Sequence, residues 1–228
     1  HTTDVAENIE AEISRNECGG VSIGVLIDAG YVISTDRAIT LTMRSADELL
    51  GYTNFSGGYE LVDGASGFLA TPNMATLMGA DSITVEDVTV DEAMGLVTLQ
   101  NMAGVDNLDF SIAGSESLTD LSVTQATAVV EATNVVAADI SVKDFAGTIV
   151  SATPGTGSID LAAVQQVTVT TSDVADEDLT TYPTLVGIAD AIELNGSVTL
   201  NVDQAGLTLT GTGSYDVRDS GMNLEYAV

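Results

Sequence analysis

The sequence predicts a mainly β protein with short helices, in which strand-rich repeats stack into a solenoid-like or sandwich-like body behind an N-terminal helix. The first observation is a repeated sequence pattern: "ITVEDVTVDEAMGL" at 83–96 resembles "ITLTMRSADELLGY" at 39–52 and "VTLNVDQAGLTL" at 198–209. The second is a series of short segments that alternate apolar and polar residues, which is the period of a half-buried strand. The third is a core composition of small aliphatic residues, with 4% aromatics and no Trp. Repeats too small to bury an apolar face alone gain a core by stacking.

The first 38 residues are not a copy of the later units, and we predict that 1–38 form an N-terminal helix and strand cap or a contact arm. Apolar residues recur at every fourth position of 4–17, which predicts a helix. Gly19-Gly20 would end it. Two strands are then expected, at 21–27 and 31–34.

From residue 39 the chain falls into units, and we predict one repeat-containing β-rich body over 39–228. Each unit opens with a short strand, at Ile39, Ile83, Ile140 and Val198. An acidic stretch with helical character follows the first two openings, and a second strand comes later, at 59–63, 110–114, 158–162 and 215–219. The third unit is longer and adds a strand and an acidic loop within 165–179.

The charge balance excludes one class of partner. The chain has 34 Asp and Glu against 5 Lys and Arg, a net charge of −29, so it would repel nucleic-acid phosphates. No apolar run approaches the ~20 residues that a membrane span needs. Cys18 is the only cysteine, which leaves no intrachain disulfide and no cysteine-based metal site.

Catalytic residues are scarce. His1 is the only histidine, so a Ser-His-Asp or Cys-His catalytic site could form only if this terminal residue folded into it. Carboxylates are so abundant that no particular pair is indicated for hydrolysis. We therefore expect that the protein is not an enzyme.

Calcium is the best small-ligand candidate, because it prefers several carboxylate and carbonyl oxygens in a turn. The densest cluster consists of Asp173, Asp176, Glu177 and Asp178. The stretch 85–92 holds a second cluster, and a solvated loop or a helix N-terminus is the alternative for both. No cofactor is expected to be required. Two sequons, at Asn54 and Asn195, also fit the glycosylation pattern.

A family resemblance rests on "ITVEDVTVDEAMGL", "NLDFSIAGSESLTDL" and "GYELVDGASGFLA". Over 39–228 the chain resembles the degenerate repeat modules of large secreted bacterial surface proteins, of the adhesin and surface-layer kind. The resemblance implies an extracellular or cell-surface location and a structural role: a self-assembling subunit of a surface layer, filament or adhesive fibre. The expected partner is a second copy, joined through strand edges. The alternatives are an adhesin module that binds glycan or calcium at the cell surface, and a virion structural protein.

Overall fold

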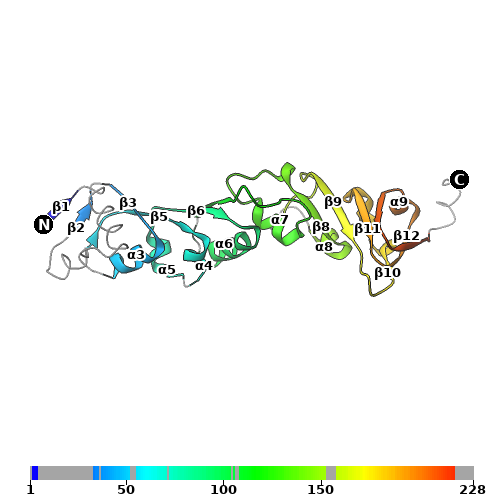
Figure 1. Ribbon diagram of the computed structural model, residues 1–228, viewed down its shortest axis with the longest axis horizontal. Coiled ribbons are helices and arrows are strands. Elements are labelled where there is room, and N and C mark those ends of the chain that lie inside the picture. Colours follow the sequence, from blue (N-terminus) through cyan, green and yellow to red (C-terminus); the bar gives the residue numbers. More distant parts are fainter. Residues whose placement is uncertain are drawn as a thin grey trace. The chain divides into compact units, whose positions relative to one another are not determined.

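A computed structural model describes most of the chain from residue 33 onward (Figure 1). The described residues are 2–4, 33–35, 37–51, 55–70, 72–103, 105, 108–152 and 158–218. The chain divides into two compact units. The first holds His1–Glu116 with Ala132–Asn134, and the second holds Ser117–Glu131 with Val135–Val228.

The first unit alternates strands and helices. One parallel sheet has the order β1 (Thr2–Asp4), β2 (Ile33–Thr35), β4 (Phe55–Ser56). A second parallel sheet has the order β3 (Ile39–Leu41), β5 (Tyr59–Gly64), β6 (Ser82–Val88), β7 (Leu108–Ile112). The helices are α3 (Met43–Leu50), α4 (Ala65–Leu69), α5 (Met74–Gly79) and α6 (Val90–Ala103).

The second unit has the same plan. Its larger sheet has the order β13 (Thr208–Gly211), β11 (Ala191–Leu194), β9 (Gln166–Thr170), β8 (Ser141–Phe145). Its smaller sheet has the order β10 (Glu177–Asp178), β12 (Ser197–Leu200), β14 (Ser214–Val217). The α-helices are α7 (Val123–Val129), α8 (Ala146–Ser151) and α9 (Val202–Ala205), and the 3-10 helices are η1 (Ala137–Asp139), η2 (Leu179–Thr181) and η3 (Pro183–Gly187).

The predicted fold class, mainly β with stacked strand-rich solenoid-like or sandwich-like repeats, is wrong. The protein is a mixed α/β structure with all-parallel sheets and alternating strand–helix units, an alternation of the Rossmann-like kind. Successive parallel strands need a crossover between them, and helices supply most of these crossovers. The polar stretches that come after the opening strands therefore form helices that connect the strands, such as the 14-residue α6, and are not minor additions to a β structure.

The strand order within each sheet matches the order of the chain. A doubly wound sheet reverses its strand order at one point, and the crevice at that point is the usual ligand site. None of the sheets in the described residues contains such a reversal. The alternation of strand and helix therefore does not by itself place a ligand crevice in this fold.

The echoed phrases are explained by how each helix begins. An apolar residue at a strand end or, for Leu121, in an isolated bridge is followed by Thr, Ser or Asn, an apolar residue, two further positions and Ala, at 41–46, 88–93, 121–126 and 200–205. The Thr, Ser or Asn side chain accepts the backbone N–H three residues later at the start of α3, α6, α7 and α9. Such side chains satisfy N–H groups that the first helical turn leaves without partners. The repeated phrase is thus a strand–cap–helix junction, and the copy at 121–126 is not among the predicted echoes.

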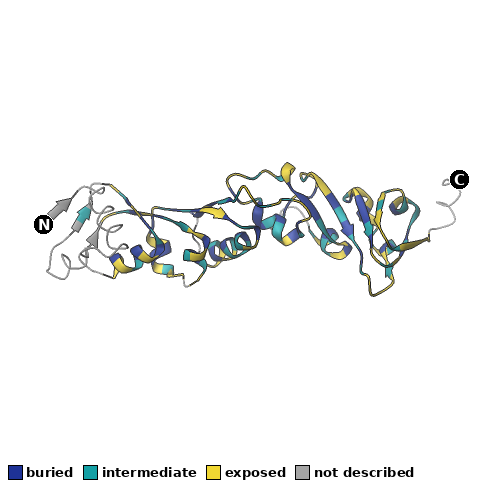
Figure 2. Cartoon of the chain, viewed as in Figure 1, coloured by how far each residue is buried: buried dark blue, intermediate teal, exposed yellow. Residues whose placement is uncertain are grey.

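The predicted opening strands are confirmed as β3, β6, β8 and β12. In β3, β6 and β12 buried positions alternate with more exposed ones, so that one side of each strand lies in the core, as for Ile83 and Val85 of β6, which are fully buried. Figure 2 shows buried positions along the strands and on the helices of both units. The strand expected at 158–162 is absent, because only Ser158 forms a bridge and a turn comes after it.

Several predictions lie outside the described residues: most of the helix at 4–17, the strand at 21–27, Cys18, His1 and Asn54. Asp4, the first residue of that helix, lies in β1 instead. The division into 1–38 and 39–228 stays a prediction. Among the described helices, none has the length and apolar character to cross a bilayer.

Candidate functional site

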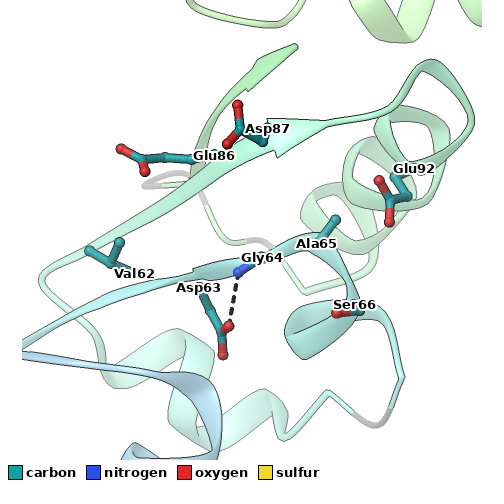
Figure 3. Close-up of a pocket in the computed structure, with 8 residues that line it drawn as sticks. All are labelled: Val62, Asp63, Gly64, Ala65, Ser66, Glu86, Asp87 and Glu92. Atoms are coloured by element: carbon teal, nitrogen blue, oxygen red, sulfur yellow. Dashed lines mark hydrogen bonds between the residues drawn. The ribbon is translucent and has the colours of Figure 1, made fainter. Parts of the chain in front are cut away.

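The carboxyl ends of β5 and β6 border a pocket of about 490 Å³ in the first unit (Figure 3). In a parallel α/β sheet, loops and helix starts converge at this edge, but none of the described sheets reverses its strand order here. The lining residues are Val62, Asp63, Gly64, Ala65, Ser66, Glu86, Asp87 and Glu92. Four of them carry carboxyl groups, which makes the pocket acidic.

Both carboxylate oxygens of Asp63 accept hydrogen bonds from backbone N–H groups. Its Oδ1 accepts the N–H of Gly64 at 2.8 Å, the bond drawn in Figure 3, and its Oδ2 accepts the N–H of Met43 at 3.1 Å. Met43 is the first residue of α3, so Asp63 caps a helix that precedes it by 20 residues. This carboxylate holds the fold together and has less capacity left for a ligand.

Glu92 is committed in the same way. Its Oε2 accepts both the N–H of Thr89 at 3.0 Å and the hydroxyl of Thr89 at 2.8 Å, while its own N–H donates to Thr89 Oγ1 at 3.3 Å. This reciprocal pair is a capping box at the start of α6. The backbone hydrogen bond from Thr89 and then the hydroxyl hydrogen bond lower the pKa of Glu92.

The other two pocket carboxylates, Glu86 and Asp87, are exposed. Asp87 has a φ of 55° at the register shift between Val85 and Val88, where β6 bulges against β7. In Figure 3 both side chains point away from Asp63. In the described part of the chain, no three His, Cys, Asp or Glu side chains come together in a group that could hold a metal ion.

The residues predicted to bind calcium lie in the second unit, before and within β10. Asp173 and Asp176 are exposed, and Glu177 and Asp178 form β10. Asp178 Oδ1 accepts the N–H of Thr180 at 3.1 Å and its hydroxyl at 2.5 Å, and the hydroxyl bond is the main reason that the pKa of Asp178 is lowered. The Arg218 guanidinium approaches Asp178 Oδ2 at 3.9 Å. The structure does not bring the four carboxylates into one group, and calcium binding here stays a prediction.

The sequon residue Asn195 has a structural role that its sequence context did not suggest. Its amide Nδ2 donates to Thr170 Oγ1 and to the Thr171 carbonyl, each at 3.0 Å. Its backbone N–H donates to Thr171 Oγ1 at 2.9 Å. Both amide hydrogens therefore join the turn after β11 to the end of β9, and a glycan on this nitrogen would displace at least one of these bonds.

Lys143, the only lysine of the chain, forms an ion pair with Glu193 across the larger sheet of the second unit. Lys143 lies on β8 and Glu193 on β11, with β9 between them. The two side chains are 30% and 27% exposed. The contact raises the pKa of Lys143, chiefly through its hydrogen bond to Glu193.

The second candidate site consists of the exposed edges of the two sheets of the second unit, formed by β13 and β14 and called the β13–β14 edge. β13 and β14 are the last strands of their sheets within the described residues. Tyr215 and Val217 pair in register with Val198 and Leu200 of β12, so they face the same side of the sheet. Val198 and Leu200 are buried, whereas Tyr215 and Val217 are 47% and 44% exposed. The side of the sheet that is apolar and buried at β12 is therefore apolar and partly exposed at β14.

An edge in the first unit contrasts with this one. Asn134 accepts the N–H of Ile112 and donates to its carbonyl, each at 2.9 Å, as a further strand would. The backbone N–H of Thr133 donates to the Phe110 carbonyl at 2.9 Å. The outer edge of β7 is therefore closed by 132–134.

Comparison with family models, curated proteins and solved structures finds no match. The function of the chain must therefore be inferred from its residues and their geometry.

Proposed function

We propose that the protein is an extracellular structural protein, a self-assembling subunit of a surface layer, filament or adhesive fibre, and that it assembles through the β13–β14 edge. The observation that carries the proposal is the pair Tyr215 and Val217, which extend the core-facing side of a sheet yet are nearly half exposed. Edge strands with exposed apolar side chains are ready templates for pairing with another chain.

Charge supports the same edge. The chain carries a net charge of −29, so most approaches of one copy to another are repulsive. β13 has no charged residue, and β14 has only Asp216, which is followed by Arg218. The edge is therefore close to neutral on an otherwise acidic chain, and two copies can meet there with the least repulsion.

The acidic exterior suits an extracellular protein that must stay soluble between assembly events. The pocket at β5 and β6 supports no competing assignment, since Asp63 and Glu92 serve as helix caps. The proposal assigns no reaction to the chain.

The test compares the wild-type protein with Val217→Lys and with Val174→Lys, by sedimentation velocity over a concentration series and by negative-stain electron microscopy. Val174 is 88% exposed in the same unit and lies on no strand, so it is the matched control. We expect ordered oligomers from the wild type and from the control, and monomers from Val217→Lys. Each protein is measured with and without added calcium.

A wild-type protein that stays monomeric at every concentration and in both ionic conditions would overturn the proposal. Assembly that is unchanged in Val217→Lys would show that another surface is responsible. A monomer that binds immobilised glycans would favour the alternative function of a cell-surface binding module.

A further inference from the structure

We draw no further inference here: the strongest candidate, the acidic pocket at the carboxyl ends of β5 and β6, is a cluster of carboxylates of which Asp63 and Glu92 serve as helix caps, and no second observation in the described residues points to a ligand.

Discussion

The carboxylate of Asp63 accepts the backbone N–H of Met43 at 3.1 Å, although the two residues are 20 positions apart in the chain. Asp144 accepts the N–H of Val123, 21 positions earlier, at the same distance. Each carboxylate also accepts the N–H of the residue directly after it, at 2.8 Å. In both units, an aspartate near the end of a strand (β5 or β8) therefore caps the first turn of a helix that comes earlier in the chain (α3 or α7).

Loss of either cap is expected to destabilise the unit that contains it. Asp63→Ala and Asp144→Ala each remove the acceptor for two backbone N–H groups, so each should lower the free energy of unfolding by about 1–3 kcal/mol. Urea unfolding followed by circular dichroism measures the change. Asp109→Ala is the control, because Asp109 is an exposed residue of β7. Equal stability of Asp63→Ala and Asp109→Ala would show that the cap contributes nothing.

The capping box of α6 predicts part of the response to acid. The pKa of Glu92 is lowered from its ordinary value of 4.5, so its contribution to stability is present above that value. It is lost as the pH falls below 4.5 and through the lowered pKa. Glu92→Gln keeps an oxygen acceptor but does not titrate.

We expect the stability of Glu92→Gln to fall less steeply than that of the wild type between neutral pH and about pH 3. Thermal unfolding at a series of pH values measures this difference. Glu86→Gln changes an exposed carboxylate of the same pocket and should match the wild-type curve. Parallel curves for wild type and Glu92→Gln would contradict the prediction.

The Lys143–Glu193 pair predicts a response to alkali. The pKa of Lys143 is raised above 10.5, so the pair stabilises the fold below that value and loses its effect as the pH rises through the raised pKa. Because both side chains are partly exposed, we expect a coupling energy below about 1 kcal/mol at neutral pH.

A double-mutant cycle with Lys143→Gln and Glu193→Gln measures this coupling by urea unfolding at about pH 7 and above about pH 11. The coupling should be positive at neutral pH and near zero at the higher pH. A coupling that is equal at both values would mean that the ammonium charge has no part in it.

Gly196 is expected to tolerate no side chain. A Cβ at this position would collide with the backbone carbonyl oxygen of Ser172, which cannot move away as a flexible side chain would. Gly196→Ala should therefore cost about 1–3 kcal/mol of unfolding free energy. Gly187→Ala is the matched control, since a Cβ there meets no atom within 4 Å. Similar thermal midpoints for the two variants would show that the turn at Gly196 can relax.

Salt should promote the proposed assembly. At a net charge of −29, repulsion between copies is screened as ionic strength rises, while the contacts of Tyr215 and Val217 are apolar and are retained. We expect the weight-average mass from light scattering to increase between about 0.01 M and 1 M NaCl, where the Debye length falls from ~30 Å to ~3 Å. Assembly that weakens with salt would instead indicate contacts between opposite charges.

Local features were readable from the sequence because they depend on neighbouring residues. The short β-rich phrase Ile83-Thr84-Val85 predicted β6, and the acidic stretch after it begins α6. The pairing of strands was not readable, because the same alternation suits antiparallel and parallel neighbours. The predicted fold class was wrong because the polar stretches between the strands form helices that connect parallel strands.

The candidate sites, too, could be predicted from the sequence only in part. The sequence identified the carboxylates around 85–92 and 173–178 as clusters, but not which of them the fold uses. Asp63 and the amide contacts of Asn195 were not identified, because their partners lie 20 or more positions away.

The sequence by itself determined where the four opening strands lie, and how strongly copies of the chain repel one another. Only the tertiary structure decided that the strands run parallel in chain order, that Asp63 caps α3, and that the buried apolar side of β12 continues as exposed residues at β14. The physical reason is range. Alternation and the cap that Thr89 provides act over a few residues, whereas strand register, side-chain burial and the cap from Asp63 depend on segments that meet only when the chain has folded.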